Sequence, residues 1–222
     1  MNQESQLPAF LYGESIFTTI KVVNGNAVDL SEHIDKLFLD AVGYFNVENL
    51  STLERKLKNE LKISDFTGAL RITIFANTRD SLTSTFCEDD LNFCFSTRKI
   101  DFSKNTEVTL KLIERVQAPE LCQFKVGSYG KELWLKRKLN EQAIDDALYF
   151  GNGKVFETTT SNIFFVKDNL TFTPKSGIYK GLTRKKIKAI EKDILVEDIL
   201  NYDEIYIGNS LFEKIKVKKI IN

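Results

Sequence analysis

Two segments of one stretch decide the fold of this chain: Phe124-Lys125-Val126-Gly127-Ser128-Tyr129 and Val155-Phe156-Glu157-Thr158-Thr159-Thr160-Ser161-Asn162. Apolar residues flank Lys125 on both sides. Just before the second segment, Gly151-Asn152-Gly153 predicts a tight turn that folds one strand back on another. We therefore expect Lys125 in apolar surroundings and Glu157 on a strand of a hairpin.

These two side chains suggest a specific chemistry. A lysine in apolar surroundings loses its proton more easily, because desolvation disfavours the ammonium form, and the neutral amine can form a Schiff base with a carbonyl. A carboxylate such as Glu157 can keep a pyridine nitrogen protonated. Pyridoxal phosphate (PLP) needs both groups from a protein, although most lysines in proteins are solvated surface charges.

The same stretch resembles the class IV aminotransferases. The resemblance lies in Lys125, Asp145-Asp146-Ala147-Leu148, Gly153-Lys154-Val155-Phe156-Glu157 and Ser161-Asn162-Ile163-Phe164, and it extends from about Tyr12 to about Val217. These are fold-type IV PLP enzymes: branched-chain aminotransferases, D-amino acid aminotransferases and 4-amino-4-deoxychorismate lyases. The resemblance implies an α/β fold of two domains, with PLP bound between them. It also implies that Lys125 carries the Schiff base and that Glu157 pairs with the pyridine nitrogen.

A polar connector near residues 98–105 indicates a boundary between two domains. We expect an N-terminal α/β domain of residues 1–100 and a C-terminal α/β domain of residues 101–222 that carries Lys125. The resemblance further implies a homodimer that acts on a small amino acid-like substrate.

Several other residues are implied as contacts of the cofactor. In Gly181-Leu182-Thr183, a glycine and a threonine at a helix start offer backbone amides and a hydroxyl to a phosphate. Lys36 stands where the family has an arginine that reaches the phosphate, and lysine can bind it only as a point charge. Lys36 can equally be a solvated surface charge, and Tyr129 can equally have a structural role without contact to the cofactor. The remaining implied contacts are Tyr129 at the phenolic oxygen, Asn162, Asn209 and Ser210.

The N-terminal segment is expected beside the substrate, with Tyr12 and Thr19 as contacts. The triplet Phe17-Thr18-Thr19 looks more like the aminodeoxychorismate lyases than the branched-chain aminotransferases. An ordinary strand rich in threonine explains the triplet equally well. The region after residue 77 lacks the family's usual substrate loop, which leaves the identity of the substrate open.

Composition excludes other classes of protein. The formal net charge is zero, so no basic excess favours nucleic acid, and no apolar run has the length of a membrane span. His33 is the only histidine, so we expect no multi-histidine metal site. Cys87, Cys94 and Cys122 show no paired spacing, which favours buried thiols in a reducing cytoplasm.

Local patterns predict several elements. Asn24-Gly25 predicts a hairpin. Capping-box patterns at Asp29-Leu30-Ser31-Glu32 and Ser51-Thr52-Leu53-Glu54 predict the starts of two helices. A helix is also expected from the region of Leu182 through Ile190.

The sequence leaves three functions open. A lyase would convert 4-amino-4-deoxychorismate into 4-aminobenzoate and pyruvate. A transaminase of branched-chain or D-amino acid type would pass an amino group to a keto acid. A degenerate relative would bind the cofactor without turnover. We favour the lyase, because of Phe17-Thr18-Thr19 and the compact length of the chain.

Overall fold

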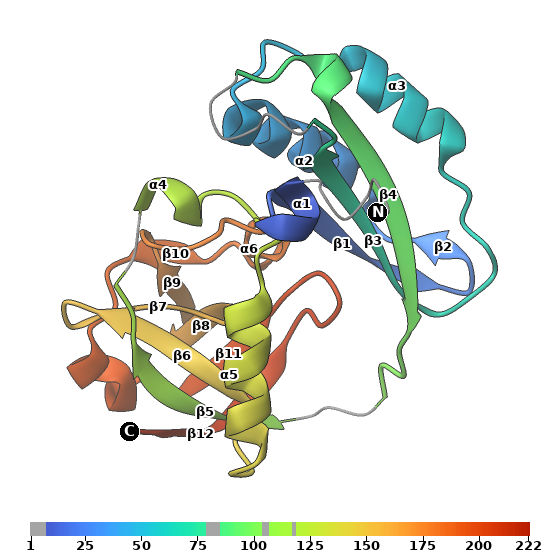
Figure 1. The fold of residues 1–222 in the computed structure, drawn as a ribbon. Helices are drawn as coiled ribbons and strands as arrows, with labels where there is room; N and C mark the ends of the chain where they lie inside the picture. The colour runs from blue at the N-terminus through green and yellow to red at the C-terminus, as the bar shows by residue number, and fades with distance from the viewer. Residues whose placement is uncertain (1–7, 79–84, 104–106, 117–118) are drawn as a thin grey trace. The chain divides into compact units, whose positions relative to one another are not determined.

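The computed structural model describes residues 8–78, 85–103, 107–116 and 119–222. The chain forms two compact units (Figure 1). The first comprises Met1–Asp101 and Phe124–Tyr129, and the second comprises Phe102–Gln123 and Gly130–Asn222. The segment that contains Lys125 therefore packs with the first unit.

The first unit is a four-stranded antiparallel sheet with two main helices. The strands are ordered β2-β1-β3-β4, and the Asn24-Gly25 turn connects β1 to β2 as predicted. The elements are α1 (Pro8–Leu11), β1 (Ser15–Val23), β2 (Asn26–Ala27), α2 (Leu30–Phe45), α3 (Ser51–Glu60), β3 (Gly68–Ala76), η2 (Glu88–Asp90) and β4 (Leu91–Lys99).

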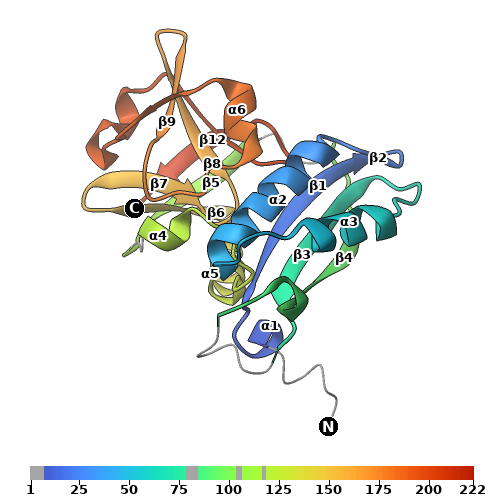
Figure 2. The ribbon, with the colours of Figure 1, turned by 90° about the horizontal axis from the view of Figure 1, so that it is seen from above.

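Helices α2 and α3 cover one face of this sheet (Figure 2). Alternate residues of β1 and β3, such as Ile16, Ile20, Ile72 and Ile74, point into a core with apolar residues of both helices. The residues between them, including Phe17, belong to the opposite face. That second face is the one available for a site.

Neither helix begins with the predicted capping box. Asp29 has a left-handed backbone with φ of 52° and makes no side-chain cap, and α3 has Leu50 at its N-cap position. Instead, the backbone N–H of Leu53 donates to Glu88 Oε1 at 2.8 Å. The cap of α3 thus comes from a residue that is distant in sequence, which local patterns do not reveal.

The second unit is built on an eight-stranded mixed sheet. The strands are ordered β10-β9-β8-β11-β12-β5-β6-β7. The elements are β5 (Glu107–Glu114), α4 (Pro119–Cys122), α5 (Gly130–Asn140), β6 (Asp146–Gly151), β7 (Lys154–Thr158), β8 (Asn162–Lys167), β9 (Leu170–Pro174), α6 (Leu182–Ile187), β10 (Ile190–Lys192), η3 (Val196–Asn201), β11 (Glu204–Gly208) and β12 (Ile215–Ile221).

The two ends of this sheet are joined by backbone hydrogen bonds. Val155 N of β7 donates to Ile194 O at 2.8 Å, and Val196 N donates to Gly153 O at 2.9 Å. Because residues 194–196 follow edge strand β10, these bonds curl the sheet toward a barrel. The hairpin expected at Gly151-Asn152-Gly153 connects β6 to β7.

The expectation of a helix through Ile190 is wrong. Helix α6 ends at Ile187, and Ile190 begins strand β10, which pairs with β9. Lys188 ends the helix in a left-handed conformation with φ of 51°, so the chain turns away from the helix axis there.

Candidate active site

The Lys125 segment is attached to strand β1 of the first unit. Phe17 N donates to Lys125 O at 3.0 Å, Gly127 N donates to Ser15 O at 2.6 Å, and Ile16 forms an antiparallel bridge with Val126. A Cβ at position 127 would lie 2.0 Å from Ser15 Oγ, so any larger residue here would displace the Ser15 hydroxyl. Backbone contacts therefore fix the position from which the Lys125 side chain extends.

Aromatic rings surround the Lys125 amine. Its Nζ lies 5.0 Å from the ring centroid of Phe17 and 6.0 Å from that of Tyr129. The two rings meet edge to face with centroids 5.4 Å apart. The expected apolar surroundings of Lys125 are thus largely aromatic, and Tyr129 lies beside the lysine.

Arg71 was not singled out from the sequence. Its guanidinium stacks on the Phe17 ring at 3.5 Å from the centroid, and its Nε donates to Thr73 Oγ1 at 3.1 Å. Burial lowers the pKa of Arg71, and Tyr129 and Cys94 partly oppose this shift. The available signal was a lone charge within the apolar strand sequence 69–75. A half-buried cation here can receive a carboxylate.

Lys36 lies on α2 and forms an ion pair. Its Nζ is 2.5 Å from Asp40 Oδ1, and the two side chains are 20% and 9% exposed. Lys36 is therefore not a solvated surface charge, which was the alternative interpretation. A phosphate bound here would share the Lys36 ammonium with Asp40. On the same helix, buried His33 meets the hydroxyl of Thr18 at 2.6 Å.

The two residues expected to contact the substrate differ in exposure. Tyr12 follows α1 and is 57% exposed. Thr19 is half-buried on β1 and pairs in register with Arg71 of β3. Since β-strand side chains alternate, Thr19 lies on the same face of the sheet as Phe17.

In the second unit, Glu157 is held by two groups. Its Oε2 accepts from Tyr179 N at 3.1 Å and from Asn162 Nδ2 at 3.3 Å, while Asn162 Nδ2 also donates to Tyr179 O at 2.8 Å. These two donors fix the position of the Glu157 carboxylate oxygen. Burial, followed by the charge of Glu157, raises the pKa of the Cys122 thiol, so that thiol is a poor nucleophile.

Residues 181–183 combine close packing with a buried hydroxyl. A Cβ on Gly181 would lie 3.2 Å from Asn162 Oδ1. The Thr183 side chain is only 4% exposed, yet no hydrogen bond to its hydroxyl is found within the described parts of the chain. A buried hydroxyl without a partner is costly, so a ligand oxygen here would satisfy it. This feature fits a phosphate of PLP.

Asn209 and Ser210 follow strand β11. Asn209 Nδ2 donates to Ser161 Oγ at 2.9 Å, and Asn209 Oδ1 accepts from Leu211 N and Phe212 N. The Asn209 side chain therefore ties this loop to the turn between β7 and β8. Ser210 is half-buried beside it. Within this unit the structure thus brings Glu157, Asn162 and Gly181 together and links Asn209 to the same turn.

The sequence model of the family described as Amino-transferase class IV matches residues 15–220. The chain belongs to this family. A D-alanine aminotransferase from Bacillus licheniformis is 24% identical over 232 residues, which cover 95% of this chain and 80% of that protein. An aminodeoxychorismate lyase from Bacillus subtilis is 28% identical over 234 residues, which cover 95% and 79%.

The fold is also similar to solved structures. A Legionella pneumophila protein assigned as a 4-amino-4-deoxychorismate lyase superposes with a TM-score of 0.79 and 22% identity, covering 98% of this chain and 86% of that one. The predicted α/β fold of the fold-type IV enzymes is confirmed. As a class IV aminotransferase family member, the chain is a PLP-dependent enzyme, which confirms the predicted cofactor.

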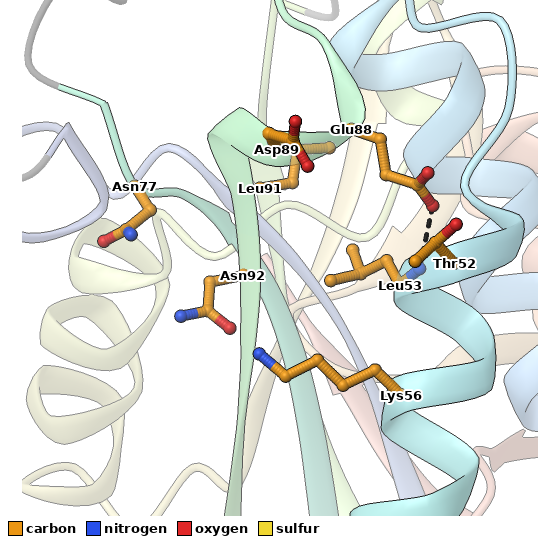
Figure 3. A pocket seen from close by; sticks show the side chains of 8 residues that line it. All are labelled: Thr52, Leu53, Lys56, Asn77, Glu88, Asp89, Leu91 and Asn92. Atoms are coloured by element: carbon orange, nitrogen blue, oxygen red, sulfur yellow. Dashed lines mark hydrogen bonds between the residues drawn. The ribbon is translucent and has the colours of Figure 1, made fainter.

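One pocket of this class IV protein lies away from the predicted residues. It has a volume of about 260 Å³ and opens between η2 and the start of α3, where Glu88 meets Leu53 (Figure 3). Its lining residues are Thr52, Leu53, Lys56, Asn77, Glu88, Asp89, Leu91 and Asn92. None of the predicted site residues lines it, so it is separate from the lysine and its aromatic neighbours.

Three further observations bear on the expectations from composition. No helix in the described ranges is long and apolar enough to cross a membrane. Among the same residues, no group of at least three His, Cys, Asp or Glu side chains could hold a metal. The prediction of buried thiols is wrong for Cys87 and Cys94, which are exposed on the first unit.

The polar loop expected to replace the family's substrate loop falls partly on residues 79–84, outside the described residues.

Proposed function

We propose that this enzyme is a 4-amino-4-deoxychorismate lyase that forms 4-aminobenzoate and pyruvate. The observation that carries the proposal is the aromatic surface around Lys125, where Phe17 stacks with Arg71 and meets Tyr129 edge to face. A cyclic substrate can pack on the half-buried Tyr129 ring, and its carboxylates can pair with Arg71, whose guanidinium is held on the buried Phe17 ring. The Bacillus subtilis lyase also has the higher identity of the two relatives above.

The proposed roles follow from the chemistry of each side chain. When bound, PLP supplies an electron sink for the carbon that carries the substrate amino group. Lys125 would hold the cofactor aldehyde until the substrate amino group replaces it there. The freed Lys125 amine would then take the proton from that carbon and later return a proton to the departing enol of pyruvate. The bond to the enolpyruvyl oxygen breaks and the ring becomes aromatic, so the two products contain all substrate atoms. Glu157 keeps the pyridine nitrogen protonated.

The remaining predicted contacts position the cofactor and the substrate. We assign the phosphate to Thr183, with Gly181 and Leu182 supplying backbone, and to Lys36. The other cofactor contacts are Tyr129 at the phenolic oxygen, Asn162, Asn209 and Ser210. Tyr12 and Thr19 are assigned to the substrate.

A transaminase of D-amino acid or branched-chain type is the second candidate, because the Bacillus licheniformis relative is a D-alanine aminotransferase. The two reactions differ in their need for an amino acceptor. We expect purified protein with PLP to convert 4-amino-4-deoxychorismate into 4-aminobenzoate with no keto acid present. Turnover that requires D-alanine or a branched-chain amino acid together with 2-oxoglutarate would replace the lyase with the transaminase. Failure of every substrate would favour the degenerate relative.

We further propose that the enzyme acts as a homodimer in the cytoplasm. Its two domains would be residues 1–100 and 101–222, with segment Phe124–Tyr129 of the second packing on the first. Helix α5 carries Leu133 and Trp134, which are 49% and 55% exposed and could be covered by a second copy. Sedimentation of the holoenzyme at the mass of one chain would contradict the dimer.

The role of Lys36 can be tested through the affinity for PLP. We expect Lys36→Ala to weaken PLP binding about tenfold, since a charge-assisted hydrogen bond to phosphate is lost. Lys36→Arg should retain binding, because it preserves the charge and can still pair with Asp40. The measurement is a titration of apoenzyme with PLP, with Asp40→Asn as the control that disrupts the ion pair but keeps the lysine. Unchanged affinity in Lys36→Ala would limit Lys36 to its ion pair with Asp40.

A further inference from the structure

A buried carboxylate in the second unit has no role in the proposed reaction. Asp146, at the start of β6, is 2% exposed. Its Oδ1 accepts from Thr159 Oγ1 at 2.5 Å and from Ala147 N at 2.9 Å, and its Oδ2 accepts from Lys136 Nζ at 3.1 Å. Three partners from three different segments meet at one side chain. Such a network is costly to bury and rigid once complete.

The network holds the turn that joins β7 to β8. Thr159 lies in this turn, two residues after Glu157 and three before Asn162. Lys136 of α5 also reaches Thr160 Oγ1, at 3.4 Å. From another side, Asn209 Nδ2 donates to Ser161 Oγ at 2.9 Å. The turn is therefore fixed by Asp146 and Lys136 on one side and by Asn209 on another.

This turn sets where Glu157 and Asn162 lie relative to one another. Within the turn, Thr158 N donates to Ser161 O at 2.9 Å, and Ser161 N donates to Thr158 Oγ1 at 3.0 Å. Glu157 Oε2 then accepts from Asn162 Nδ2 across the two strands. A shift of the turn would move both Glu157 and Asn162, and with them the carboxylate oxygen of Glu157.

We propose that Asp146, with Lys136 and Thr159, is a positioning residue that holds Glu157 against the pyridine nitrogen of the cofactor. This inference rests on the proposed function, because it assumes that Glu157 pairs with PLP. Lys136 neutralises the charge of Asp146, so this ion pair adds no net negative charge near Glu157. The hydroxyl of Thr159 links Asp146 to the turn.

The most selective test removes only the Thr159 hydroxyl. Thr159→Val keeps the size and branching of the side chain and deletes the bond to Asp146. We expect PLP to bind about tenfold more weakly, the size of effect that loss of a hydrogen bond to a charged group produces. Thr159→Ser, which keeps the hydroxyl, should restore affinity. Asp145→Asn is the matched control, since Asp145 Oδ2 accepts from Thr109 N at 2.7 Å and Asp145 lies outside the turn.

A double-mutant cycle separates positioning from general stability. In single-turnover experiments with saturating PLP, Thr159→Val should slow the reaction about tenfold when Glu157 is present and have no further effect in a Glu157→Gln background. Equal losses in both backgrounds would overturn the inference, because the turn would then act independently of Glu157. If Thr159→Val fails to fold, Lys136→Met provides a second variant, because it removes the ion pair between Lys136 and Asp146.

The parent protein distinguishes failure of this inference from failure of the proposed function. If the parent binds PLP at Lys125 and Thr159→Val has parental affinity and rate, the positioning role is wrong and the proposed function stands. If the parent takes up no PLP, both are wrong.

Discussion

Lys125→Ala should abolish turnover while leaving PLP bound as the free aldehyde. A positioned acid–base group contributes roughly 10²–10⁴-fold to a rate, and this variant also loses the amine that exchanges with the substrate. The backbone of residue 125 accepts from Phe17 N, so the substitution keeps the bond that attaches this segment to β1. The measurement is the single-turnover rate with 4-amino-4-deoxychorismate, beside PLP affinity.

Borohydride reduction gives an independent readout of the same residue. Reduced parent protein should carry a pyridoxyl group on Lys125, and Lys125→Ala should carry none. Lys131→Ala is the matched control, because Lys131 is an exposed lysine at the start of α5. A label on any other lysine in the parent would contradict the assignment of Lys125.

Glu157→Gln should slow proton removal from the substrate about 10²–10³-fold, the cost of losing one preorganised electrostatic contact in an active site. A neutral amide cannot hold the proton on the pyridine nitrogen, so the ring loses much of its capacity as an electron sink. The amide oxygen can still accept from Tyr179 N, as Glu157 Oε2 does at 3.1 Å, so we expect the fold to be retained.

Rapid mixing of substrate with PLP-loaded variant measures this step directly. Glu141→Gln serves as the control, because Glu141 is exposed and forms a local ion pair with Lys138 at 3.0 Å. If Glu157→Gln retains the parental rate, then Glu157 is not the partner of the pyridine nitrogen, and the assignment of residues 153–164 to the family motif must be revised.

Short-range patterns predicted much of the fold. The turns at Asn24-Gly25 and Gly151-Asn152-Gly153 carry residues that tolerate positive φ, and both connect antiparallel strands. The patterns at residues 29–32 and 51–54 correctly predicted that helices α2 and α3 begin there, although neither predicted capping box forms. The family, fold and cofactor followed from Lys125 and Glu157 within their motifs.

Interactions between distant residues were not predictable in the same way. The cap of α3 by Glu88 joins positions 35 residues apart. The stacking of Arg71 on Phe17 depends on the pairing of β1 with β3, and the Asp146 network needs three segments to meet. Even the local pair of Lys36 and Asp40 was missed, because four-residue spacing makes an ion pair possible without requiring it.

The curled eight-stranded sheet has a consequence for the nascent chain. Strand β7 can complete its bonds only after Ile194 and Val196 have been synthesised, and Ile194 follows Val155 by 39 residues. At roughly 5–20 residues per second, translation leaves this edge open for roughly 2–8 s. An open strand edge is a template for pairing with other chains. During that interval the edge of β7 can pair with a strand of another chain.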